Sequence, residues 1–243
     1  MNIRFLGTSH GVPLPKRHCQ SFLIETDGGD YLFDAGAPVM DILINENYDL
    51  KRLRAVFVTH MHSDHFTGLL DLTCLASWYY KDMNFQVFLP EQGGITAIKS
   101  YSAAIYSNLS KRVQLKLFSA GEVFSENGFT VLAYHTDHMD ATSNIAYGFL
   151  VKTSKKSVYI TGDMHRTLKD FNPLLATEKT DLVVAECAHF EPSALFEKLK
   201  DCKTAAVAVV HVFPVEKYEQ LKALAPKLPF KMLFPNDGDV YKV

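Results

Sequence analysis

The chain has 243 residues, of which 47% are hydrophobic and 21% are charged, and its formal net charge at pH 7 is -2. This is an ordinary globular composition that can bury a large core. The mild negative charge excludes a general attraction to nucleic acid, and the basic pairs are scattered as on a solvated surface.

Cysteine usage and the first residues bear on the compartment. The four cysteines form no CxxC pair and no dense framework, which favours a reducing, intracellular environment. Residues 1–7 resemble a strand entering a glycine turn rather than a signal peptide. No apolar stretch approaches the roughly 20 residues of a membrane span. We therefore expect a soluble, cytoplasmic protein that does not enter a membrane.

The first half of the chain is predicted to be rich in strands. The loop over residues 7–17 is too long for a tight hairpin and is available to line a site. Asp27-Gly28-Gly29-Asp30 is a hairpin signal, and Pro38 suits the first turn of a helix. In chain order, strands are expected over residues 3–6, 21–25, 31–33, 54–58 and 85–89, and helices over residues 38–47, 66–80 and 95–109.

The later part of the chain alternates strand and helix. Strands are expected over residues 113–118, 129–134, 146–152, 158–160, 182–185, 205–210 and 231–234, and helices over residues 168–176, 193–199 and 215–225. No repeat or linker interrupts the pattern, so one domain over residues 1–243 is the simplest interpretation. The pattern predicts an α+β fold in which two mixed β-sheets pack face to face with helices on both outer faces.

The strongest local motif is Thr59-His60-Met61-His62-Ser63-Asp64-His65. It places four potential metal ligands within six residues, directly after the apolar run of residues 55–58. A strand fixes the start of such a loop, and the loop can turn several side chains toward one point. The motif therefore predicts a metal site.

Further candidate ligands also stand just after strand-like runs. Loops at one set of strand ends converge, so ligands that are distant in sequence can meet there. The residues in such positions are His135, His138, Asp163 and His211.

These motifs, in this order, resemble the metallo-β-lactamase fold. Residues 59–65 resemble its His-x-His-x-Asp-His signature, and residues 32–36 its Asp-x-Gly element. The opening Phe5-Leu6-Gly7-Thr8, with Pro13, Arg17 and Ser21, is similar to the ribonuclease Z branch. The remaining motifs that agree are residues 133–138 followed by 146–148, residues 161–163, residues 207–211 and Asp237-Gly238.

The resemblance implies a complete dinuclear site. One ion would be held by His60, His62 and His138, the second by Asp64, His65 and His211, and Asp163 would bridge them. His135 is the alternative to His138. The ligand types suit zinc, with manganese or iron as alternatives. Two divalent ions about 3.5–4 Å apart would share a hydroxide that acts as the nucleophile.

Several other residues carry two interpretations. The resemblance makes Asp34 a partner that orients the metal loop, although a turn residue is the alternative. With Asp64 and Asp163, His189 completes the predicted catalytic set, as a proton donor to the leaving group or else as a structural histidine. His165 could contact substrate phosphate. The remaining residues with alternative roles are His10 and His18 as exposed loop residues or cleft residues, Cys187 as a small buried residue, and Trp78-Tyr79-Tyr80 as helical core, pocket wall or the face of a homodimer.

The predicted reaction is hydrolysis of a small phosphodiester, such as a cyclic nucleotide or a cyclic sugar phosphate. True ribonuclease Z carries a long basic arm that grips tRNA, and no such insertion lies between residues 65 and 211. Together with the net charge, this disfavours nucleic acid as the partner, because phosphate backbones are bound largely through Lys and Arg. The alternatives are tRNA 3′ processing, hydrolysis of a carboxylic ester, lactone or sulfate ester, a redox di-iron role and a non-catalytic binding protein.

Overall fold

The computed structural model describes residues 1–12, 14–139, 142 and 144–243, and the chain divides into two compact units. The first unit contains residues 1–118 and 236–242, and the second contains residues 119–235 and Val243. Pro13 of the opening motif lies outside the described residues. Each unit contains one seven-stranded sheet, so the prediction of two sheets is confirmed.

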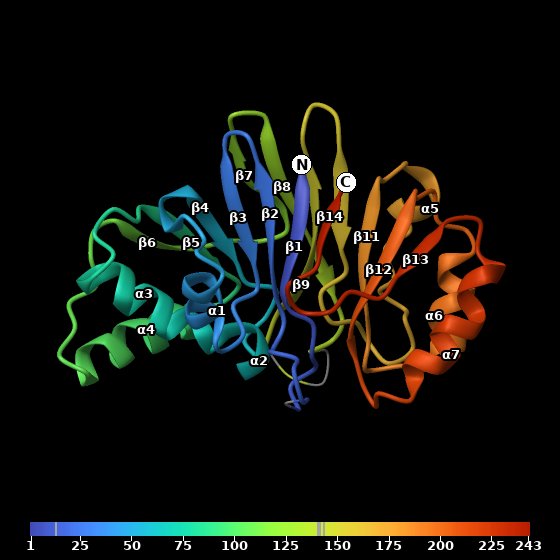
Figure 1. The fold of residues 1–243 in the computed structure, drawn as a ribbon, viewed down its shortest axis with the longest axis horizontal. Coiled ribbons are helices and arrows are strands. Elements are labelled where there is room, and N and C mark those ends of the chain that lie inside the picture. The colour runs from blue at the N-terminus through green and yellow to red at the C-terminus, as the bar shows by residue number, and fades with distance from the viewer. Residues whose placement is uncertain (13, 140–141, 143) are drawn as a thin grey trace. The chain divides into compact units, whose positions relative to one another are not determined.

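The sheet of the first unit has the order β14-β1-β2-β3-β4-β5-β6 (Figure 1). Its strands pair antiparallel from β14 to β3 and parallel from β3 to β6, so the sheet is mixed as predicted. The elements of this unit are β1 (Asn2–Gly7), β2 (Ser21–Thr26), β3 (Gly29–Phe33), α1 (Val39–Asn45), a 3-10 turn (Leu50–Arg52), β4 (Leu53–Phe57), α2 (Ser63–Phe66), α3 (Gly68–Trp78), β5 (Phe85–Leu89), α4 (Gln92–Ala104), β6 (Val113–Leu117) and β14 (Val240–Lys242).

Both faces of this sheet carry buried apolar side chains. On one face, leucines, valines and isoleucines pack with helices α1, α3 and α4 in a single core. On the other, a ladder of phenylalanines crosses neighbouring strands, and the ring centroids of Phe33 and Phe57 lie 5.1 Å apart. Strands buried on both faces are expected to be apolar nearly throughout, which explains why residues 55–58 show no alternation.

The second unit has the sheet order β13-β12-β11-β10-β9-β8-β7 (Figure 1). Here the antiparallel part comes first in the chain, from β7 to β10, and the parallel part follows, from β10 to β13. The elements are β7 (Gly121–Glu126), β8 (Phe129–Thr136), β9 (Ala146–Lys152), β10 (Ser157–Ile160), α5 (Leu174–Thr177), β11 (Leu182–Cys187), α6 (Pro192–Leu199), β12 (Ala206–Val212), α7 (Lys217–Leu224), a 3-10 turn (Ala225–Lys227) and β13 (Lys231–Leu233).

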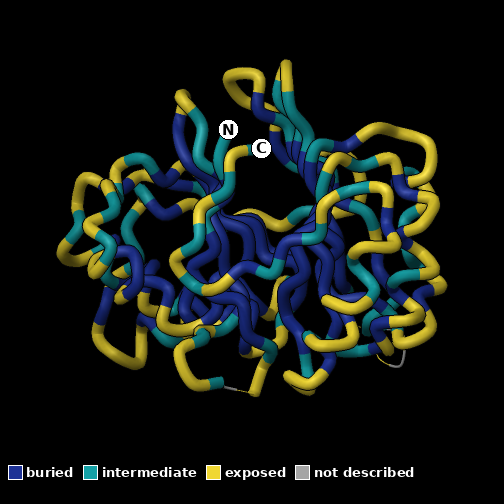
Figure 2. Tube along the Cα trace, turned by 45° about the vertical axis from the view of Figure 1, so that its right-hand side comes forward, coloured by how far each residue is buried: buried dark blue, intermediate teal, exposed yellow. Residues whose placement is uncertain are grey.

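Most strands are buried in both units, whereas many of the loops are exposed (Figure 2). The core of the second unit packs α6 and α7 with the parallel strands. Among the described residues, no helix is long and apolar enough to cross a membrane.

Two strands were missing from the sequence prediction. β7 is exposed along most of its length, so its sequence lacks a core-facing pattern. Nevertheless Glu126 pairs with Phe129 across Asn127-Gly128, both with positive φ, which is a standard hairpin signal that was overlooked. β14 has only three residues and exists because it pairs with β1.

Three predicted helices were wrong in extent, and the one expected over residues 95–109 is α4, which already ends at Ala104. The helix expected over residues 168–176 is restricted to α5, because Pro173 disfavours a helical conformation at the preceding residue and Leu168 has φ of 53°. The helix expected over residues 66–80 is split into α2 and α3 at Thr67. Trp78 and Tyr79, at the end of α3, are 47% and 69% exposed, so the core-packing interpretation fails for both.

Candidate metal centre

The candidate ligands of the first unit follow β4, as the sequence predicted. His60 and His65 are fully buried, Asp64 is nearly so, and His62 is exposed. The ring centroid of His60 lies 4.6 Å from that of His62 and 4.2 Å from that of His65. His65 Nε2 lies 3.4 Å from Asp64 Oδ2. The loop and α2 thus gather all four side chains within this unit.

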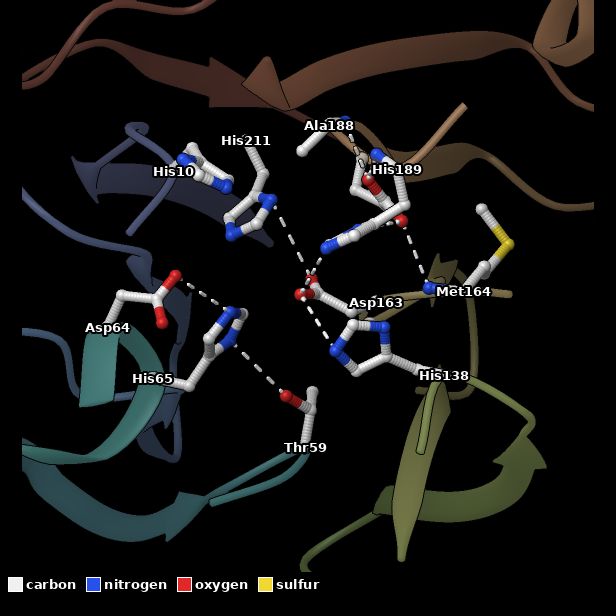
Figure 3. Close-up of polar contacts among 12 residues, drawn as sticks. His10, Thr59, Asp64, His65, His138, Asp163, Met164, Ala188, His189 and His211 are labelled. Atoms are coloured by element: carbon white, nitrogen blue, oxygen red, sulfur yellow. Dashed lines mark hydrogen bonds and ion pairs between the residues drawn. The ribbon is translucent and has the colours of Figure 1, made fainter. Parts of the chain in front are cut away.

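A buried hydrogen-bond network orients this group. The Asp34 carboxylate accepts from the Thr59 backbone N–H at 2.8 Å and from the Thr59 hydroxyl, and it lies 2.8 Å from His65 Nδ1 (Figure 3 labels Thr59 and His65). Thr59 Oγ1 also lies 3.0 Å from His60 Nδ1. With Nδ1 of His65 engaged by a carboxylate, Nε2 is the nitrogen left to face an ion, which is a common arrangement in metal sites.

Close backbone packing supports the same network. Asp34 follows β3 in the left-handed region at φ of 55°. A Cβ at Gly36 would lie 2.3 Å from the carbonyl oxygen of Asp64, and one at Gly68 would lie 2.5 Å from that of Gly36. Only residues without a side chain allow the 34–36 turn to approach α2 and the start of α3 so closely.

In the second unit Asp163 is the centre of a histidine cluster. Its Oδ2 lies 3.7 Å from His138 Nε2 and 3.9 Å from His189 Nε2, and its Oδ1 lies 3.8 Å from His211 Nδ1 (Figure 3). Asp163 is 2% exposed and His211 is fully buried. Ligand atoms of Asp163, His189 and His211 all lie within 4.8 Å of one another, so these three residues could hold an ion.

A β-bulge directs His211. The pairing of β11 with β12 steps from Glu186↔Val210 to Cys187↔Val212, so His211 is the extra residue of the bulge, with φ of 52°. Bulges commonly redirect a side chain beside a functional site. Asp163 follows Gly162, whose φ of 59° is also in the left-handed region. The Thr136 hydroxyl fixes that turn by donating to the Asp163 carbonyl oxygen at 2.8 Å.

His138 and His135 have different surroundings within the second unit. His135 is exposed and stacks on Tyr147, with ring centroids 4.6 Å apart. His138 faces Asp163 and lies 4.5 Å from the His189 ring, centroid to centroid. His135 lies on the side of β8 that carries Val131 and Ala133, as the alternation predicted, but unlike those two residues it is exposed.

Two carboxylates support the second group, and the sequence analysis assigned neither of them a role. Glu186, 1% exposed, lies 2.9 Å from His189 Nδ1 and accepts from the backbone N–H groups of Met164 and Ala188 (Figure 3). Asp170 accepts from the N–H groups of Asp137 and His165, so it joins the links that carry His138 and Asp163. Glu186 could have been found from the sequence, because it is a charged residue inside the apolar run 182–187. No comparable sequence pattern marks Asp170.

The remaining candidates have simpler surroundings. His18 Nδ1 lies 2.9 Å from Asp237, and His165 Nδ1 lies 2.7 Å from the Thr167 hydroxyl. Burial raises the pKa of the Cys187 thiol to about 12, which is consistent with a small buried residue rather than a ligand. Burial, with the charge of Asp64 adding to it, also raises the pKa of the Cys19 thiol.

The residues fit a metal on the chemistry of their donor sets. Each unit presents buried imidazole nitrogens beside a carboxylate, and in each a second carboxylate holds the opposite ring nitrogen of one histidine. Nitrogen and oxygen donors of this kind suit zinc and related divalent ions.

Comparisons with known proteins agree with this description. Ribonuclease Z of Archaeoglobus fulgidus is 28% identical over 137 residues, which cover 56% of this chain and 44% of that protein. The chain thus spans less than half the length of such curated relatives.

Two solved structures show the fold. Human tRNase Z, short form (ELAC1), matches with a TM-score of 0.78 at 19% identity, over 100% of this chain and 99% of that one. The metallo-beta-lactamase fold protein YhfI from Bacillus subtilis matches with a TM-score of 0.79 at 16% identity, over 99% and 98%. The chain therefore has the metallo-β-lactamase fold, and the resemblance to the ribonuclease Z branch is confirmed.

The family itself follows from a match over most of both units. The model of the family described as Anti-Pycsar protein Apyc1 matches residues 1–221, a range that contains every candidate ligand named above. The chain belongs to the Anti-Pycsar protein Apyc1 family.

Proposed function

We propose that this chain is a metal-dependent hydrolase that cleaves a small phosphodiester, with a cyclic nucleotide or a cyclic sugar phosphate as the first candidate. The carrying observation is that each unit holds a buried His/Asp group oriented by a further carboxylate, Asp34 in one and Glu186 in the other. Membership of the Apyc1 family and similarity to proteins named ribonuclease Z support the same class of chemistry. Residues 1–243 would then act as one catalytic domain, in the cytoplasm.

The proposed ligands are those implied by the sequence motifs. His60, His62 and His138 would hold one ion, Asp64, His65 and His211 a second, and Asp163 would serve both. The contacts of Asp163 with His138 and His211 inside the second unit support the shared role. Zinc is the first choice, because imidazole and carboxylate are its usual ligands, with manganese or iron as alternatives.

The chemistry would divide between the ions and the chain. When bound, divalent ions lower the pKa of water toward neutrality and offset negative charge on a phosphate. His189 would donate a proton to the leaving oxygen, because its Nδ1 is held by Glu186 and its Nε2 is the nitrogen directed toward Asp163. Asp64 and Asp163 would supply the negative charge that retains the ions.

The stretch between residues 65 and 211 favours a small substrate over RNA. Its described residues form the strands, helices and links of the two units, and no long basic arm is found among them. The net charge of -2 supports the same choice. Processing of tRNA 3′ ends is the second candidate, favoured by the relatives named ribonuclease Z.

A substrate panel tests the proposal. The metal-loaded protein would be assayed with bis-p-nitrophenyl phosphate, cyclic nucleotides, p-nitrophenyl acetate, a lactone and a tRNA precursor. We expect hydrolysis of the phosphodiesters and none of the carboxylic esters. Cleavage of the precursor alone would favour the second candidate, and turnover of esters without phosphodiesters would contradict the proposal.

A matched pair of variants tests the site. Asp64→Ala should abolish hydrolysis and lower the metal content while the far-ultraviolet circular dichroism is unchanged. Asp71→Ala removes the same residue type from the exposed face of α3, where the carboxylate accepts only from the Tyr101 hydroxyl among the contacts seen, and should retain activity. Full activity of Asp64→Ala would show that the ligand assignment is wrong.

A further inference from the structure

The link from β11 to α6 carries His189, and a side chain from α7 contacts its backbone. We call residues 187–190 the His189 turn. Glu186 binds this turn from one side, by accepting from the N–H groups of Ala188 and His189. The backbone carbonyl groups of the His189 turn also need hydrogen-bond donors, because buried backbone oxygens are almost always hydrogen-bonded.

Lys217 supplies those donors. Its Nζ lies 2.7 Å from the carbonyl oxygen of Phe190, 3.0 Å from that of Ala188 and 3.5 Å from that of Cys187. An ammonium group has three N–H donors, so the three carbonyls can use all of them. The carboxylate oxygen Oε1 of Glu191 lies 3.9 Å from Nζ, on a side chain that is 69% exposed.

The position of Lys217 is unfavourable for a lysine on two counts. The residue is 6% exposed, and burying a charge costs free energy unless it is well hydrogen-bonded. It is also the first residue of α7, where the positive end of the helix dipole disfavours a cation. The three hydrogen bonds to carbonyl oxygens of the His189 turn explain why a lysine stands at this position.

We propose that Lys217 is a positioning residue for His189. Lys217 fixes the carbonyls of the His189 turn and Glu186 fixes its N–H groups and the His189 ring, so Nε2 keeps one direction relative to Asp163. The catalytic part of this proposal rests on the proposed hydrolase function, in which His189 protonates the leaving group. The anchoring of the His189 turn by Lys217 does not depend on that function.

Hydrogen exchange tests the anchoring part without any assay of activity. Lys217→Met keeps an unbranched side chain but removes all three donors. We expect amide exchange in residues 187–190 to accelerate by about tenfold or more, with the sheet strands unchanged. Lys222→Met is the control, because Lys222 lies on the same helix and contacts exposed Glu219. Unchanged exchange in the His189 turn of a folded Lys217→Met protein would overturn the proposal.

Two leaving groups test the catalytic part. A cyclic nucleotide expels a ribose alkoxide that needs a proton, whereas bis-p-nitrophenyl phosphate expels p-nitrophenolate, which does not. We expect Lys217→Met and His189→Ala each to lower kcat for the cyclic nucleotide by about 100-fold and to change kcat for bis-p-nitrophenyl phosphate by only a few fold. KM should be unchanged in both variants, the metal content should be unchanged in Lys217→Met, and the double variant should be no slower than His189→Ala.

A milder variant guards against misfolding. Lys217→Gln keeps two N–H donors on a shorter chain and should fall between the wild type and Lys217→Met. Equal losses on both substrates, or loss of metal, would assign Lys217 a purely structural role and overturn the proposal. If the wild type cleaves neither phosphodiester, the proposed function fails, and the exchange experiment alone decides whether Lys217 anchors the turn.

Discussion

At the scale of single residues, the candidate centre contains two buried carboxylates outside the proposed ligand set. Asp34 and Glu186 are both at most 1% exposed, and each contacts one ring nitrogen of a histidine. Such partners fix the tautomer and the orientation of the ring, and they make the opposite nitrogen a better donor. Removing them should therefore weaken metal binding or catalysis without removing a ligand.

Asp34→Asn should lower the affinity for metal by about 10–100-fold. Asparagine tolerates the positive φ of this position, so the turn is retained, but its amide cannot replace the negative charge beside His65. Competition with a coloured chelator would measure the affinity. Asp49→Asn, at an exposed cap where the side chain accepts from Lys51, is the control. Equal affinities for both variants would show that Asp34 is only a turn residue.

At the scale of elements, the metal loop owes its place to backbone packing. α3 begins at Gly68 against the carbonyl oxygens of Ala35 and Gly36, and α2 with Asp64 and His65 lies directly before it. Any side chain at Gly68 must push α3 away from the 34–36 turn. We therefore expect stability and metal binding to be coupled at this contact.

Two glycine substitutions in helices should have opposite effects. Gly68→Ala should destabilise the protein by about 1–3 kcal/mol, because its Cβ would overlap backbone oxygen. Gly93→Ala, where a Cβ meets nothing within 4 Å near the start of α4, should stabilise it by about 0.5–1 kcal/mol. Urea unfolding measures both, and the idea fails if Gly68→Ala is as stable as the wild type.

The start of β10 is tied to the chain entering β11 by Asp181, which gives a pH dependence. Burial alone would raise the pKa of Asp181, but hydrogen bonds from Lys156 Nζ and the Ser157 N–H outweigh it and lower the pKa. A lowered carboxyl pKa stabilises the fold above the unfolded value of about 3.9, and this stabilisation is lost as pH falls through the folded pKa.

Asp181→Asn should therefore be less stable than the wild type at pH 7, and the gap should narrow below about pH 4. Chemical unfolding at a series of pH values measures the gap. Asp82→Asn is the control, because Asp82 is 74% exposed and pairs only with exposed Lys51 among the contacts seen. A gap that stays constant with pH would refute the assignment.

At the scale of the whole molecule, the proposed ligands extend from His60 to His211 and come from both compact units. A ligand that binds only the folded chain stabilises it by about 2.7 kcal/mol at 100 times Kd. For a domain of this size, each kcal/mol is worth about 2–4 °C in Tm.

Chelation should therefore lower Tm by about 5–10 °C, and added zinc should restore it. Differential scanning calorimetry, combined with metal analysis of the protein before and after chelation, measures the effect. Asp64→Ala should begin at a lower Tm and respond less to the chelator. A Tm that is the same with and without metal would exclude the proposed centre.

Much of this protein was determined locally by its sequence. His60, His62, Asp64 and His65 are close to one another and to an apolar strand in the sequence, so short-range pattern alone predicted four of the seven proposed ligands. Runs such as residues 85–89 and 146–152 were found for the same reason, since a buried strand needs continuous apolar side chains.

Only the tertiary structure decided those strands and side-chain roles that depend on partners distant in the sequence. β7 and β14 are strands only because β8 and β1 offer edges to pair with. Glu186 gains its role from amides of residues 164 and 188, and Lys217 from carbonyls 27 to 30 positions away in the chain. Residues 59–65 thus predicted a metal-dependent reaction from the sequence alone, whereas the orientation of His189 could be seen only in the folded chain. Hydrogen bonds from a side chain to backbone groups elsewhere in the chain leave no periodicity in the sequence, so only the fold brings such partners together.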